Sequence, residues 1–257
     1  MRSGILSATL VACSFLANAP ASAQGVKIGI LNDQSGVYAD YGGKYSLEAA
    51  HMAVEDFGGS VLGQKIEIVT ADHQNKPDLG ATIARRWYDA ENVDMITELT
   101  TSSVALAVQE LSKEKKKIDI VVGAATSRIT GDACTPYGFH WAYDTRALAV
   151  GTGGALVKAG GDSWFFLTAD YAFGHALERD TSEVVKKSGG TVVGGVRHPL
   201  NTADFSSFLL QAQSSKAKVI GLANAGGDTT NAIKQAAEFG IVQGGQKLGA
   251  LLFFIND

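Results

Sequence analysis

The sequence predicts an α/β protein made of two parallel sheets with helices on both faces. From Gln24 onward, short apolar runs rich in β-branched residues alternate with amphipathic stretches whose apolar residues recur at helical spacing. A stretch punctuated by Gly and Pro, residues 131–145, divides this alternation into two similar rounds. Alternating strands and helices favour parallel sheets, so we expect each round to form one doubly wound lobe.

The first round is expected to supply the N-terminal lobe, residues 24–142. Its first helix ends before the Gly58-Gly59 pair, its second begins just after Pro77, and its third is N-capped by Ser102 or Ser103. The strands are expected at residues 26–31, 65–71, 93–97 and 118–123, and the helices at 41–57, 78–91 and 103–115.

The second round is expected to supply the second lobe, residues 143–257. Residues 139–143, an aromatic cluster, are interpreted as the crossover between the lobes. Gly189-Gly190 and Gly240 end two of the helices. The helices are expected at residues 146–158, 174–187, 205–214 and 229–239, and the strands at 164–168, 191–196, 219–223 and 248–255.

Residues 1–23 have the pattern of a secretory signal peptide. Arg2 gives a positive start, residues 5–19 are small and apolar, and Ala21-Ser22-Ala23 is a cleavage site of the A-x-A kind. A rival lipoprotein-like cleavage before Cys13 would anchor the protein by a lipid. Both alternatives export the protein, and a periplasmic location is expected.

Composition excludes several classes of function. The sequence is 46% apolar and 19% charged with a formal charge of −4, so it has no basic footprint for nucleic acid. It lacks G-x-S-x-G, a Walker motif, and a G-x-G-x-x-G after the first strand, and its five histidines have no metal-ligand spacing. We therefore expect no enzyme activity, no catalytic residues, no metal and no cofactor. An exported α/β enzyme stays a minor alternative.

Candidate binding residues follow the predicted strands, where open α/β sheets bind ligands. Residues 100–103 are four consecutive hydroxyls opening a helix, which suits a carboxylate beyond ordinary N-capping. Tyr171 and Phe173 are either walls for an apolar ligand or core residues. Asp228 and Asp257 would each receive an ammonium group or cap a turn.

Six segments stand in a characteristic order, residues 26–36 (VKIGILNDQSG), 41–42, 48–50, 100–103, 123–126 and 170–174. This ordered set resembles a known family, the periplasmic substrate-binding proteins of branched-chain amino acid ABC transporters. Such leucine-binding-protein-like proteins have the type I periplasmic-binding-protein fold, two doubly wound lobes joined by a hinge. The resemblance implies capture of a small-molecule ligand, transient docking to membrane permease subunits and a monomeric protein.

The resemblance also implies roles for individual residues. The carboxylate would be held by the hydroxyl run and the Ala-Ala-Thr turn, here Thr101, Ser102, Ser103, Ala124, Ala125 and Thr126. Tyr41 would be a wall of the first lobe. Phe173 stands where amino acid binders usually have Tyr, and Tyr171 could substitute. Asp257, or else Asp228, would take the ammonium.

Two departures from the family shape the expected function. Members are normally longer, so both lobes are expected to be incomplete and the sequence to be truncated at its C-terminal end. Residues 32–43 and Phe173 resemble a subgroup that takes aromatic carboxylates. The sequence therefore predicts a solute-binding protein for a branched-chain or other hydrophobic amino acid. A benzoate- or phenylpropanoid-like carboxylate is the alternative ligand, and a ligand sensor for a regulator or receptor is the alternative role.

Overall fold

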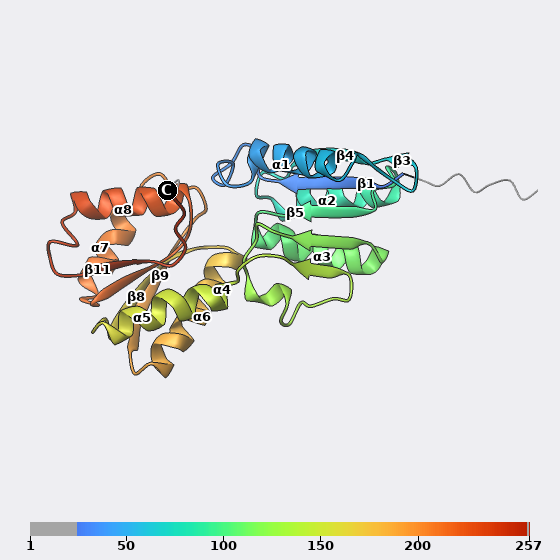
Figure 1. Ribbon diagram of the computed structural model, residues 1–257. Coiled ribbons are helices and arrows are strands. Elements are labelled where there is room, and N and C mark those ends of the chain that lie inside the picture. The colour runs from blue at the N-terminus through green and yellow to red at the C-terminus, as the bar shows by residue number, and fades with distance from the viewer. Residues whose placement is uncertain (1–24, 256) are drawn as a thin grey trace, which may run out of the picture.

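The computed structural model describes residues 25–255 and 257, and the predicted leader lies outside these residues. Two lobes, each built around one sheet, lie side by side (Figure 1). The backbone completes the five-stranded sheet of the first lobe before it passes into the second lobe. The predicted fold, two doubly wound parallel-sheet lobes, is confirmed.

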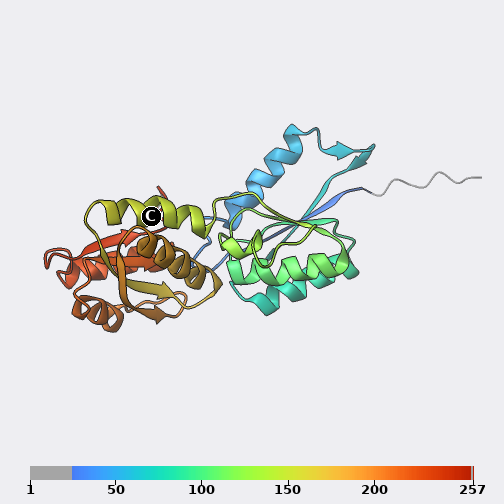
Figure 2. The same ribbon diagram turned by 90° about the horizontal axis from the view of Figure 1, so that it is seen from below.

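The first sheet is parallel throughout, and its core lies under the two helices on one face. Leu31, Trp87 and Val104 are buried there, whereas α1 on the opposite face buries only Gly43 and projects with a small hairpin (Figure 2). In spatial order the strands are β4 (Glu67–Asp72), β1 (Lys27–Asn32), β5 (Met95–Glu98), β6 (Ile118–Val121) and β7 (Gly138–His140). The helices are α1 (Gly43–Asp56), α2 (Pro77–Asp89) and α3 (Ser102–Lys115).

The second sheet is covered on both faces, and its central strand shows why. Trp164 and Phe166 belong to one buried cluster, while Phe165 and Leu167 belong to another, as the two-residue repeat of a strand requires. The strands, in spatial order, are β11 (Lys247–Ala250), β10 (Val219–Ala223), β8 (Ser163–Ala169) and β9 (Thr191–His198). The helices are α4 (Thr145–Leu148), α5 (Gly154–Lys158), α6 (Ala172–Lys187), α7 (Ser206–Ser214) and α8 (Gly227–Glu238).

Both sheets share one winding, which fixes where a ligand should bind. In each sheet the backbone makes its first strand, adds the second on one side, and then crosses to add the third on the other side. The direction in which successive strands are added therefore reverses between β1 and β5 in the first lobe, and between β8 and β10 in the second. Ligands of such sheets lie beyond the carboxyl ends of the strands at this switch point.

The crossover was predicted to begin two residues too early. Residues 139–143 were expected to connect the lobes, but β7 (Gly138–His140) pairs with β6 as the parallel edge strand of the first sheet. Directly after β7, Trp141 N–H still donates to Val121 O at 2.8 Å. Three half-exposed residues give too short a pattern to be recognised as a strand, so the pairing was missed.

Three other local features differ from prediction. The last strand ends at Ala250, not at residue 255. The single helix expected over 146–158 contains a π-helical turn, Ala149–Gly153, where glycines lower helix propensity. A hairpin of β2 (Ser60–Val61) and β3 (Gln64–Lys65) was not predicted, and its turn puts Leu62 and Gly63 at φ 51° and 76°.

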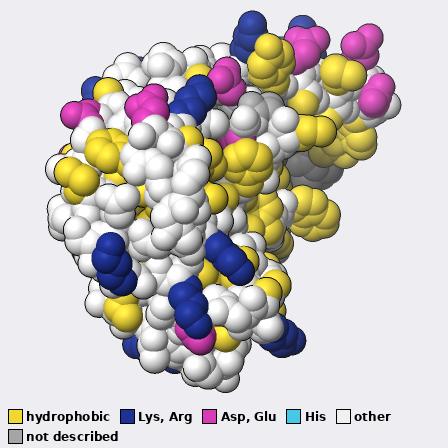
Figure 3. All heavy atoms as spheres, turned by 90° about the vertical axis from the view of Figure 1, so that its left-hand side faces the viewer, with side chains coloured by type: hydrophobic (Ala, Val, Ile, Leu, Met, Phe, Trp, Pro, Cys, Tyr) yellow, Lys and Arg dark blue, Asp and Glu magenta, His cyan; other side chains and the backbone are white. Residues whose placement is uncertain are grey.

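Charged side chains of both signs occur on the surface of the second lobe. Basic and acidic side chains are scattered over the face of the second lobe (Figure 3). Within the part of the sequence that the structure describes, no helix is both long and apolar enough to cross a bilayer.

Candidate functional site

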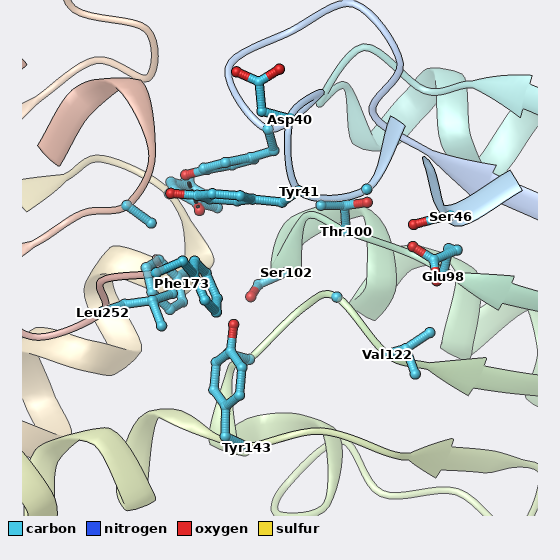
Figure 4. A pocket seen from close by; sticks show the side chains of 17 residues that line it. Asp40, Tyr41, Ser46, Glu98, Thr100, Ser102, Val122, Tyr143, Phe173 and Leu252 are labelled. Carbon is cyan, nitrogen blue, oxygen red and sulfur yellow. Dashed lines mark hydrogen bonds between the residues drawn. The ribbon is translucent and has the colours of Figure 1, made fainter. Parts of the chain in front are cut away.

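A cavity of about 340 Å³ lies between the lobes, at the switch points of both sheets (Figure 4). The segments after β1, β5 and β6 line it from the first lobe, and those after β8, β10 and β11 from the second. The lining residues are Tyr38, Asp40, Tyr41, Gly42, Ser46, Glu98, Thr100, Ser102, Val122, Gly123, Ala125, Tyr143, Tyr171, Phe173, Ala225, Leu252 and Phe254.

The start of α3 is the most polar part of the first-lobe wall. The hydroxyl of its N-cap residue, Thr101, makes no capping hydrogen bond, so the first turn keeps unsatisfied N–H groups. Ser102 lines the cavity although it is only 1% exposed, and its Oγ accepts a hydrogen bond from Thr126 N–H at 3.2 Å. Thr100 also lines the cavity, and its buried Oγ1 has no hydrogen-bond partner among the described residues. Free donors at a helix N-terminus suit an anion.

The hydroxyl run splits into two pairs with different surroundings. Thr100 and Ser102 line the cavity, whereas Thr101 and Ser103 do not. Thr101 is fully buried and donates its hydroxyl hydrogen bond to Asn75 Oδ1. Ser103 Oγ accepts a hydrogen bond from Ala172 N–H at 3.3 Å, so it joins the two lobes at the edge of the site.

The Ala-Ala-Thr turn contributes one lining residue. Ala125 lines the cavity, and its carbonyl accepts Thr145 N–H at 2.8 Å, which ties the turn to the second lobe. Ala124 is buried behind it. Thr126 is also buried and lies outside the lining, and its hydroxyl accepts a hydrogen bond from Arg128 N–H at 3.5 Å.

Aromatic rings form the second-lobe wall and reach across from the first lobe. Tyr171 and Phe173 were predicted as walls or core, and both line the cavity. Phe173 also belongs to the buried second-lobe core, and Tyr171 is partly buried and packs against that core. The hydroxyls of Tyr171 and Tyr38 lie 2.6 Å apart across the lobes. Burial raises the pKa of both phenols, so both stay neutral near neutral pH. Leu252 closes the same end of the cavity (Figure 4).

The predicted wall residue Tyr41 lines the cavity and connects it to the C-terminal segment. Its ring stacks edge-on against Phe254 with centroids 4.7 Å apart, and its hydroxyl donates to Asp257 Oδ1. Asp257 lies outside the cavity lining, and its Oδ2 also accepts Phe254 N–H at 2.7 Å. Tyr143 approaches from the crossover, and burial raises the pKa of its phenol to about 12. Asp257 is thus already paired with two protein donors.

Asp228 does not line the cavity. It is only 1% exposed and accepts hydrogen bonds from Asn201 N–H at 3.1 Å and Thr202 N–H at 2.8 Å. Burial raises the pKa of this carboxyl to about 6. The Asp228 carboxyl therefore holds the loop after β9 in the second lobe, and its predicted contact with a ligand stays a prediction.

Sequence reasoning missed several lining residues. Thr100 belongs to the hydroxyl run, but the predicted carboxylate contacts began one residue later, at Thr101. Glu98 is the last residue of β5, and its orientation into the cavity had no sequence signal. Ser46 on α1 had none. Tyr143 and Phe254 belong to segments interpreted as a crossover and a strand. Aromatic residues at the ends of those segments could have been included as walls.

The charges around the cavity are unusual for a site that holds an anion. None of the described residues lining it is Lys, Arg or His, while Asp40 and Glu98 are acidic. Positive potential comes instead from helix starts at Gly42, Thr101 and Tyr171, where the first N–H groups receive no capping hydrogen bond from the N-cap residue. Over residues 25–255 and 257, no group of three His, Cys, Asp or Glu is placed to hold a metal ion.

A family model described as periplasmic binding protein matches residues 25–257. The protein belongs to this family. A periplasmic binding protein from Burkholderia mallei is 60% identical, with a TM-score of 0.88 over 90% of this chain and 61% of its own. A branched-chain amino acid ABC transporter ligand-binding protein from Burkholderia xenovorans LB400 is 39% identical, with a TM-score of 0.73 over 90% of this chain and 62% of its own.

Other members differ in the ligand their names report. A Leu/Ile/Val-binding protein homolog from Brucella melitensis is 26% identical over 245 residues, 94% of this chain and 62% of its own length. A solute-binding protein of an R. palustris ABC transporter, solved with 4-hydroxybenzoate, is 28% identical with a TM-score of 0.78, over 87% of this chain and 60% of its own. The sequence thus spans about three fifths of these relatives.

The family decides the class of protein. Its members are solute-binding proteins of ABC transporters, not enzymes, and the family implies a periplasmic location. The predicted type I fold agrees with these neighbours.

Proposed function

We propose that this protein is the solute-binding component of an ABC importer and captures a small carboxylate ligand in the cavity between its lobes. One observation carries the proposal. The cavity places the uncapped start of α3 together with the Thr100 hydroxyl, which has no partner among the residues that the structure describes, beside apolar walls. A buried hydroxyl without a partner is costly, and a ligand carboxylate would satisfy it together with the free N–H groups.

The ligand we propose is a branched-chain or other hydrophobic amino acid. Phe173 and Leu252 offer an apolar end for the ligand's hydrophobic group, opposite the polar groups of the first lobe (Figure 4). The family relatives named for leucine, isoleucine and valine support this class. Delivery to permease subunits after transient docking, export by residues 1–23 and a monomeric state complete the proposal.

An aromatic carboxylate is the second candidate ligand. The cavity is lined by six aromatic rings, from Tyr38, Tyr41, Tyr143, Tyr171, Phe173 and Phe254. Such rings favour stacked or edge-on contacts with an aromatic ligand. The R. palustris neighbour with 4-hydroxybenzoate supports this alternative.

A thermal-shift screen of the purified protein separates the candidates. A ligand at a hundred times its Kd stabilises the folded state by about 2.7 kcal/mol, which raises Tm by roughly 5–10 °C in a protein of this size. Leucine, isoleucine or valine should give this shift. A shift only with benzoate or phenylpropanoid acids would support the second candidate, and a cooperative melt that no carboxylate shifts would contradict both.

A further inference from the structure

One end of the cavity forms a polar subsite, which consists of Glu98, Ser46 and Thr100. These residues gather at the end opposite Phe173 and Leu252 (Figure 4). Glu98 makes no ion pair with any residue that the structure describes. The subsite therefore contains a carboxylate without a protein cation.

The backbone that carries Glu98 is held in a sparsely populated conformation. Glu98 and Leu99 have φ values of 80° and 55°, and neither is glycine. The turn is fixed from two sides: Glu98 O accepts Val122 N–H and Gly123 N–H, both at 3.1 Å, and Leu99 N–H donates to Leu31 O at 2.9 Å. Left-handed conformations of ordinary residues cluster at ligand sites. This one ends β5 so that Glu98 and Thr100 both line the cavity.

The carboxylate of Glu98 is poorly satisfied without a ligand. Burial raises its pKa, and only the Ser46 hydroxyl opposes that shift. Buried charges require a counter-charge or hydrogen bonds. A simple carboxylic acid brings a second negative charge into a cavity lined by two acids and no base, whereas a zwitterion brings a cation of its own.

Gly42 shows that the two polar groups face a common space. A methyl group added there would lie 2.7 Å from Thr100 Oγ1 and 3.6 Å from Glu98 Oε2. The two oxygens therefore lie near one another beside Gly42, close enough for the adjacent carboxylate and ammonium of an α-amino acid to contact one each.

We propose that the Glu98 carboxylate accepts the ammonium of the ligand, so that the site selects zwitterionic α-amino acids over simple carboxylic acids. The assignment rests on the proposed function and narrows its ligand class. The acceptor is then a first-lobe residue, while Asp257 and Asp228 are occupied by protein donors.

The experiment is a calorimetric titration with two matched pairs of probes. Leucine is compared with 4-methylpentanoate, and phenylalanine with 3-phenylpropanoate, which differ only by the amino group. The wild type should bind each amino acid at least about tenfold more tightly than its partner, the scale of one charge-assisted hydrogen bond. In Glu98→Gln that preference should fall to near one, while binding of the acids persists.

Control variants distinguish the loss of the Glu98 charge from a general effect of substitution on folding. Glu55→Gln removes an exposed carboxylate from α1 and should keep the preference. Glu98→Asp keeps the charge and should restore part of it. If Glu98→Gln does not fold, Gly42→Ala tests the same subsite, because its added methyl should weaken amino acid binding.

The outcomes are distinct. A preference for amino acids that survives Glu98→Gln, or a wild type that prefers the acids, overturns the role of Glu98 but leaves carboxylate capture standing. A Gly42→Ala protein with unchanged leucine affinity also counts against the subsite. Failure of all four probes, and of benzoate, to bind the wild type overturns the proposed function itself.

Discussion

Replacing Thr100 by Val should make the protein more stable and a weaker binder at once. Thr100 Oγ1 is buried and has no hydrogen-bond partner among the described residues. An unsatisfied buried polar atom costs about 1–3 kcal/mol, and valine keeps the shape without the hydroxyl. We expect Thr100→Val to gain about 1 kcal/mol in the free energy of unfolding, or about 2–4 °C in Tm.

The same substitution removes a donor for the ligand carboxylate. A hydrogen bond to a charged group contributes about 1.5–3 kcal/mol, so ligand affinity should fall by about 10- to 150-fold. A stability gain paired with an affinity loss is the signature of a group retained for binding. The ligand that shifts Tm most in the screen serves as the titrant.

Two further threonines provide matched controls. Thr181 Oγ1 on α6 is also buried without a partner among the described residues, but it lies outside the cavity, so Thr181→Val should stabilise and leave affinity unchanged. Thr97 Oγ1 donates to Ile120 O at 2.9 Å, so Thr97→Val should destabilise by about 0.5–1.5 kcal/mol. Chemical denaturation and calorimetry measure both quantities. A Thr100→Val protein that is less stable and binds normally would refute the reasoning.

The remaining predictions concern packing, burial and the contact between the lobes. Gly123→Ala places a methyl 2.7 Å from Thr100 Cα, which should lower stability by about 1–3 kcal/mol in a denaturant melt. Burial raises the pKa of Asp119 to about 7, above its unfolded value. The contribution of this carboxyl to stability should therefore be lost as pH rises from about 4 through 7, so melts across pH should show wild-type stability falling relative to that of Asp119→Asn over this range. Asp180 is only 5% exposed and accepts Thr145 Oγ1–H at 2.6 Å, so Asp180→Ala should cost about 1–3 kcal/mol, and an unchanged melt would contradict this.

Periodicity and punctuation were enough to predict the architecture. The runs that became β8 and β10 are buried over nearly their whole length, and their apolar character is visible without any alignment. The helix stops at Gly189 and Gly240 are local, because a positive φ there favours glycine. The edge strand β7 could not be predicted, because its pairing with β6 depends on a contact rather than on its own pattern.

The residues of the site likewise include some that the sequence could predict and some that it could not. Ser102 and Phe173 follow strands at a switch point, so their positions at the cavity could be inferred from topology. Glu98 could not, because a left-handed turn without glycine orients it and no residue type signals such a turn. The pairing of Asp228 with Asn201 likewise depends on a loop distant in sequence.

A crystal structure of the complex with the ligand that raises Tm most tests the central claim most directly. We predict a ligand carboxylate oxygen within about 3.2 Å of Thr100 Oγ1 or of the first N–H groups of α3, with the apolar body against Phe173. A ligand bound outside the cavity, or one whose carboxylate lies at the Phe173 end, would contradict the account.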